Sequence, residues 1–111
     1  MNPYVDEAIR LFDEGDYFMA HETLEEHWIE ALEPDRNFLQ GLIHLAVGFH
    51  HHKRANQTGA RLQFRKASIR LKDYPASYEG VDVQAVRSFL GSASGELDEG
   101  RKLDPPNLRA G

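Results

Sequence analysis

Two residues that could do chemistry stand one helical turn apart in the stretch GDYFMAHETLEEHW, residues 15–28. On a helix of about 3.6 residues per turn, His21 and Glu25 share one side. His21 also falls within the apolar stripe of this helix, which consists of Tyr17, Ala20, Leu24, Trp28 and Ala31. A polar side chain inside a protein is costly unless it is hydrogen-bonded. We therefore expect the His21 ring to point inward, with Glu25 as a neighbour.

A second polar stripe recurs at helical spacing further along the chain, at Gln40, His44, Val47 and His51. If this helix packs against the first one, its polar residues can supply the missing hydrogen-bond partners. From the two helices we predict one buried polar cluster. Its members are His21, Glu25, Gln40 and His44, with His51 at one end.

Metal binding is one chemistry that such a cluster could support. The segment HETLE is similar to the H-E-x-x-H helix of zinc proteases, but Glu25 stands where the second histidine should be. His21, Glu25 and His44 with water would still be a sensible zinc or iron site. The three consecutive histidines at positions 50–52 point about 100° apart on a helix and do not chelate one ion. We favour a hydrogen-bonded network and expect no cofactor, with zinc or iron as the alternative.

General acid–base catalysis is another chemistry open to a buried His–Glu pair, because its pKa values can be tuned toward neutral pH. No serine elbow, phosphate-binding loop or other nucleophile motif accompanies the pair. The sequence therefore leans against an enzyme, and a metal-dependent enzyme remains the alternative.

The elements that must position these residues are helices throughout. Asn2 and Pro3 are suited to begin a first helix, Asp16 a second, Asn56 a fourth and Asp82 a fifth. A third helix is predicted over about residues 36–54. We expect an all-α fold of two tetratricopeptide-like hairpins packed together plus a fifth, C-terminal helix. Residues 1–99 would form one domain, and residues 100–111, DPPNLRAG among them, a tail that can be loosely ordered.

A weak internal repeat supports the two hairpins. With a shift of 40 residues, Asp16 falls on Asn56 and Ala20 on Ala60. Each copy is a helix, a polar turn with a capping residue, and a helix with a small residue near its start. Hairpins of this kind serve as interaction modules. The expected function is thus a protein-interaction or scaffold domain, with a protein partner or self-association through Trp28, Phe49 or the fifth helix.

Charge is distributed very unevenly along the chain. Residues 1–35 carry a net charge of −10, residues 36–72 one of +8 and residues 73–111 one of −3. Glu22, Glu26 and Glu30 form an acidic row on the second helix. We expect the acidic and basic segments to fold against each other.

The alternative use of the basic segment is binding of nucleic acid through the fourth helix. Its patch consists of Arg61, Arg65, Lys66, Arg70 and Lys72. Aromatic residues suited to base stacking are not interleaved there, and the chain as a whole has a net charge of −5. We regard nucleic acid as the less favoured partner.

Three motifs together carry a resemblance to a known family. F-x-x-G-x-Y-x-x-A-H-E-x-L-E-x-x-W runs from Phe12 to Trp28, F-L-Q-G-L-I follows, and N-x-x-G-A comes after His51. Over about residues 4–75 the chain resembles the bacterial and archaeal family catalogued as domain of unknown function 309. The resemblance implies a small all-helical protein with no established activity. The family's motif positions would fall on His21, Glu22, Glu25, Trp28, Gln40, Gly41, His51, Asn56, Gly59 and Ala60.

One departure from that family concerns His44, where the resemblance leads us to expect a glutamine. An essential ligand role for His44 is weakened by this difference. The chain has no cysteine, no apolar run of membrane-spanning length and no secretory signal at its start, so we expect a cytoplasmic protein without a membrane segment.

Overall fold

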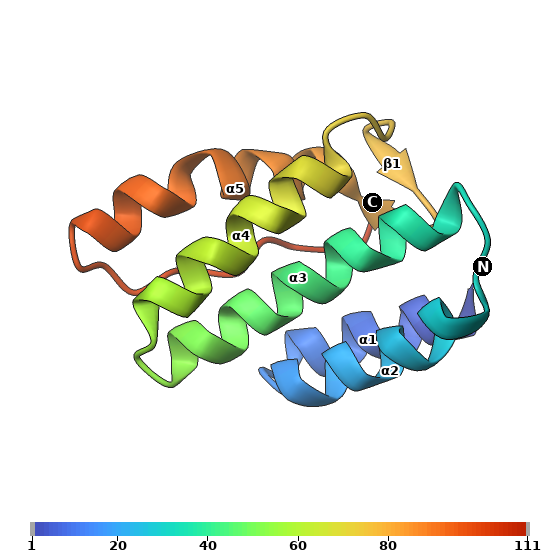
Figure 1. The fold of residues 1–111 in the computed structure, drawn as a ribbon, viewed down its shortest axis with the longest axis horizontal. Coiled ribbons are helices and arrows are strands. Elements are labelled where there is room, and N and C mark those ends of the chain that lie inside the picture. The colour runs from blue at the N-terminus through green and yellow to red at the C-terminus, as the bar shows by residue number, and fades with distance from the viewer. Residues whose placement is uncertain (1, 111) are drawn as a thin grey trace.

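The computed structural model describes residues 2–110 and is mostly helical. Two layers are visible in Figure 1: α2, α3 and α4 lie side by side in the layer nearer the viewer, and α1, α5 and the C-terminal tail lie behind them. The predicted all-α class is confirmed. The helices are α1 Pro3–Asp13, α2 Tyr17–Glu30, α3 Asp35–Lys53, α4 Gln57–Leu71 and α5 Val83–Asp98.

Capping residues start the helices where the sequence predicts. The Asn2 side chain accepts from the backbone N–H groups of Tyr4 and Val5, and Asp16 accepts from Met19. Gly15 joins α1 to α2 with a φ of +80°, a conformation that costs glycine little. These local devices form the first hairpin, α1 with α2.

The second hairpin, α3 with α4, is packed more closely. Asn56 caps α4 by accepting from the Gly59 N–H at 3.0 Å. A Cβ atom at Gly41 would lie 2.6 Å from the Leu71 side chain, and one at Gly48 would collide with the Phe64 ring. Both glycines therefore allow the two helices to approach closely.

The core is built from aromatic and aliphatic side chains of both hairpins. Phe49 is 1% exposed and packs edge to face on Phe12 and Phe64. Phe49 thus joins the two hairpins and is no anchor for self-association, contrary to one option raised by the sequence. Among the described residues, no polar or charged residue is buried.

The segment between α4 and α5 contains a small structure that the sequence did not predict. Strands β1 Ser77–Tyr78 and β2 Val81–Asp82 pair antiparallel around a turn in which Glu79 and Gly80 both have positive φ. The strands are short, so the fold class is unchanged.

The C-terminal tail is packed rather than loose. Leu103 and Leu108 are each 4% exposed, and Val81 forms a bridge with Arg109. The Asp82 N–H donates to the Leu108 carbonyl at 2.8 Å. The prolines prevent a helix here, but an extended segment can still bury its leucines and pair with a strand edge.

None of the helices within residues 2–110 combines the length and the apolar character that crossing a membrane requires.

Candidate functional site

Helix α3 is open to solvent along one stripe of its middle. From Phe38 to Phe49 its residues are buried, except for Gln40, His44 and Val47, which are partly exposed. These three share one side of the helix at i, i+4, i+7 spacing, and α3 itself lies between α2 and α4. We call the surface formed by this stripe and the neighbouring outer residues of α2 and α4 the α2–α3–α4 face.

His21 and Glu25 form the pair that the sequence suggests, but at the edge of this face. The His21 Nε2 atom lies 2.7 Å from the Glu25 carboxylate, and the two side chains are 21% and 45% exposed. The predicted burial is therefore wrong. The interior side of α2 is filled by Ala20 and Leu24 against the core, and the imidazole lies beside that contact, with the Phe18 ring 5.8 Å away.

His44 has a different partner, Gln63 of α4. Because an amide oxygen can only accept, His44 Nδ1 donates to Gln63 Oε1 at 2.8 Å. Partial burial lowers the pKa of His44, and the positive charges of Lys66 and Arg70 lower it further. The neutral ring is thus the favoured form.

Gln63 was missed in the sequence because it stands at the edge of the apolar stripe of α4, where a polar residue is ordinary. Its position one turn from Ala60 and Ala67 was the available signal.

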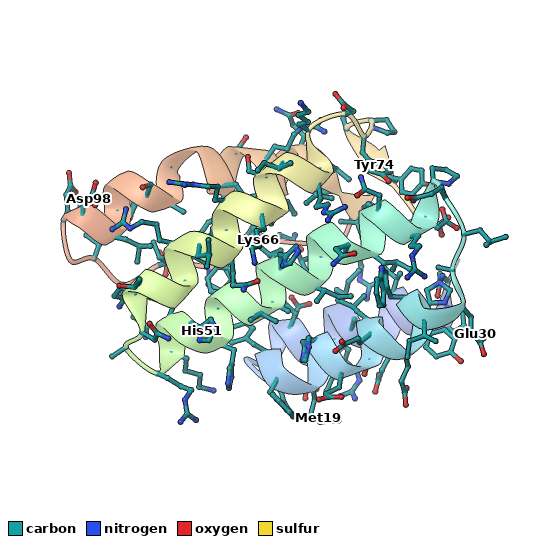
Figure 2. All side chains as sticks on the ribbon, viewed as in Figure 1. Met19, Glu30, His51, Lys66, Tyr74 and Asp98 are labelled. Atoms are coloured by element: carbon teal, nitrogen blue, oxygen red, sulfur yellow. The ribbon has the colours of Figure 1, made fainter. Side chains whose placement is uncertain are left out.

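A groove of about 420 Å³ runs between α3 and α4 beside His44. Gln40 lines it, and Arg70 donates to Asn37 Oδ1 at 2.8 Å at its edge. The Lys66 side chain also lines the groove, midway along α4 (Figure 2). Gln40, His44 and two cations therefore meet in one open groove, with no carboxylate among its lining residues.

The end of α3 holds three further histidines, His50, His51 and His52, each in its own contact. His51 lies near the turn into α4 (Figure 2), with its Nδ1 atom 3.4 Å from the Asn56 amide nitrogen. The His50 ring packs on Phe18, and burial followed by the charge of Arg54 lowers the pKa of His50.

His52 connects three parts of the chain. Its Nδ1 donates to Gln57 Oε1 at 2.8 Å, and its Nε2 accepts the Leu103 N–H at 3.0 Å. Both contacts need a neutral ring protonated at Nδ1, so this histidine anchors the tail to α3 and α4.

The predicted cluster is therefore divided among separate places. His21 pairs with Glu25, His44 with Gln63, and His51 with Asn56. Within residues 2–110, no group of three His, Asp or Glu side chains is close enough to hold a metal ion. The structure does not bring the three candidate ligands together.

The charges of the two segments also remain apart. Of the eight basic side chains in residues 36–72, only Arg61 has an ion pair among the described residues, and its partner, Asp98 at 2.8 Å, belongs to α5. Arg36 lies over the Trp28 ring, 4.0 Å from its centre, and donates to the Trp28 carbonyl. The acidic and basic segments fold against each other as expected, through α2 and α3, but no ion pair joins them among the described residues. Instead α2 gives the face an acidic edge and α4 a basic one.

Comparison with known proteins identifies the family. The model for a domain of unknown function, number 309, matches residues 5–62, about half of the chain. The chain belongs to the domain of unknown function 309 family. An uncharacterized protein of Aquifex aeolicus (strain VF5) is 30% identical over 105 residues, which are 93% of this chain and 30% of that protein. The uncharacterized protein YpuF of Bacillus subtilis (strain 168) is 41% identical over 59 residues, 52% of this chain and 34% of YpuF. The chain thus spans about a third of the length of these relatives.

Several motif positions expected for the domain of unknown function 309 family have structural roles here. Gly41 admits Leu71, Asn56 caps α4, and Ala60 is fully buried. A Cβ atom at Gly59 would meet the Asn56 amide at 2.7 Å. The fold alone accounts for these four.

The other motif positions in this family member lie on or beside the α2–α3–α4 face. They are His21, Glu22, Glu25, Trp28, Gln40 and His51, all partly or fully exposed. The Trp28 Nε1 atom is buried without a hydrogen-bond partner. Since packing does not demand polar residues at such positions, they are the strongest candidates for function.

Proposed function

We propose that this chain is a protein-interaction domain that docks a protein surface on its α2–α3–α4 face. One observation carries the proposal: α3 opens to solvent along a neutral polar stripe between an acidic helix and a basic helix, and most charged side chains of these two helices have no ion-pair partner among the described residues. We also propose that the protein is cytoplasmic, as the sequence predicts.

The composition of the face favours a protein over nucleic acid. Glu22 and Glu26 of α2 are exposed and have no hydrogen-bond or ion-pair partner among the described residues. A phosphate backbone laid across the face would meet these carboxylates as well as Lys66 and Arg70. A protein surface can present both signs of charge and match both edges.

Exposed apolar residues also border the charged edges. On α2, Phe18 is 49% and Ile29 67% exposed, and on α4, Leu62 is 50% and Ile69 61% exposed. Apolar side chains next to unpaired charges are typical of protein interfaces, in which burial provides affinity and charge provides selectivity.

Photo-crosslinking tests this proposal. A photoreactive amino acid placed at Gln40, in the centre of the face, should form protein adducts in extracts of cells that make the protein. The same residue at Ser92, exposed on α5, is the matched control and should form none. Mass spectrometry identifies the adducts.

Charge reversal then connects the adduct to the face. Lys66→Glu with Arg70→Glu should remove the Gln40 adduct, and Arg101→Glu with Lys102→Glu, an equal change in net charge on the tail, should keep it. Adducts that persist in the first variant, or that form equally from Ser92, would overturn the proposal.

A further inference from the structure

We propose that a second copy of this chain binds the α2–α3–α4 face, in a two-fold dimer that lays α2 of each copy over α4 of the other. This inference deepens the proposed function and depends on it. The observations that carry it are the relative heights of α2 and α4, their opposite charges, and the neutral stripe between them.

The first step concerns which residues of α2, α3 and α4 lie at the same level along the helix axes. His44 bonds Gln63, and Asn37 bonds Arg70, so the residue numbers of level α3 and α4 positions sum to 107. Across α2 and α3, Arg36 donates to the Trp28 carbonyl, and the His50 ring packs on Phe18. These contacting pairs sum to 64 and 68. An α2 residue therefore lies level with the α4 residue numbered about 39 to 43 higher.

This spacing includes the 40-residue shift of the internal repeat, so repeat equivalents lie at nearly the same level. Their charges are opposite. Glu26 is level with Lys66 and Glu30 with Arg70, whereas Arg65, which is level with Glu25, lines a groove against α5. Between these pairs, Ile29 is level with Ile69, and both are more than 60% exposed.

The second step is symmetry. Helices α2 and α4 both run antiparallel to α3 and hence parallel to each other (Figure 1). A two-fold axis along α3, in the plane of the face, keeps every height and exchanges the two edges. It therefore places α2 of one copy on α4 of the other with acid opposite base, and it does so twice.

The third step is the axis itself, where each copy meets its own equivalent residues. Like charges at a two-fold axis repel, so a charged stripe there would oppose the dimer. The stripe of Gln40, His44 and Val47 carries no fixed charge, and its neighbours favour the neutral form of His44. The part of the face that must contact itself is the part without fixed charge.

A pair of charge-reversal variants tests the dimer. Glu26→Lys with Glu30→Lys places lysines opposite Lys66 and Arg70, and Lys66→Glu with Arg70→Glu places glutamates opposite Glu26 and Glu30. Sedimentation equilibrium of the wild-type chain should give twice its 12.6 kDa mass. Each variant alone should sediment as a monomer, because both of its α2–α4 contacts become repulsive.

An equimolar mixture of the two variants should restore a dimer containing one chain of each. That restoration excludes misfolding as the reason for the monomers, and circular dichroism of each variant gives a second check. Asp13→Lys with Asp104→Lys, exposed acids away from the face, is the matched control and should remain dimeric.

Three results would overturn the inference: a monomeric wild-type chain at millimolar concentration, a mixture that stays monomeric, or assemblies that keep growing beyond two chains. None of them overturns the proposed function, which fails if Gln40 forms no protein adduct, if its adducts persist in Lys66→Glu with Arg70→Glu, or if they form equally from Ser92.

Discussion

The two helical hairpins share one interior design and differ in their surfaces. Each begins its second helix with a capping side chain, Asp16 or Asn56, and follows it with a buried alanine, Ala20 or Ala60. The outer residues at equivalent places have opposite charge, as with Glu26 and Lys66. Packing fixes the interior and leaves the exposed positions free, so the fold does not require the difference in charge, and the proposed docking function makes use of it.

The largest expected effect on stability comes from truncating the equivalent core side chains Leu24 and Phe64 of the two hairpins, which are 3% and 4% exposed. Phe64→Ala should lower the free energy of unfolding by about 3–5 kcal/mol, and Leu24→Ala by about 2–5 kcal/mol. Phe64 should cost more, because its ring packs on Phe49 and Phe89 and lies directly against Gly48.

Urea titration measures both losses, and Leu62→Ala, on the exposed side of α4, is the control with a change within about 0.5 kcal/mol. Equal losses from Leu62→Ala and Phe64→Ala would break the assignment of inner and outer sides.

The next largest test removes the two caps. Asn56→Ala and Asp16→Ala should each destabilise the protein by about 1 kcal/mol. Asn56 accepts from its helix at 3.0 Å, whereas Asp16 accepts at 3.3 Å. We therefore expect the larger loss in the second hairpin, measured by thermal unfolding. A larger loss from Asp16→Ala would mean that charge at the helix terminus outweighs bond geometry.

A third test uses pH. The folded pKa of His44 is lowered, so the unfolded chain binds protons more readily, and the contribution of His44 to stability is complete above the unfolded value of about 6.5 and falls as the pH drops below it. His44→Gln should therefore make the loss of stability between neutral and acidic pH smaller than in the wild-type chain. His50, whose pKa is also lowered, keeps part of the slope. An unchanged slope in His44→Gln, measured by urea titration across that range, would contradict the lowering of the His44 pKa by partial burial and by the groove cations.

The sequence predicted the helices and their caps because these depend on neighbouring residues. Helix starts depend on proline geometry and side-chain capping within the first turn, as at Pro3, Asp16 and Asn56. No contact with a distant residue is needed for them. The 3.6-residue period also placed Gln40 and His44 on one side of α3. It could not tell whether that side is covered, because α3 is apolar around most of its circumference and only long-range packing decides which side stays open. For the same reason the partnership of His44 with Gln63 was not foreseen.

The smallest expected effect distinguishes the two locations considered for His21. Were the ring inside the core, His21→Ala would leave a buried carboxylate or amide unpaired and cost about 1–3 kcal/mol. In the structure Glu25 is 45% exposed, so water can replace the lost partner, and an exposed i, i+4 pair contributes only about 0.3–0.5 kcal/mol. We expect urea titration of His21→Ala to show a loss below about 1 kcal/mol, reduced further by salt. A loss well above that figure would indicate that the imidazole lies in the interior. The acidic residues at the α2 edge of the face would then be required in part by the fold.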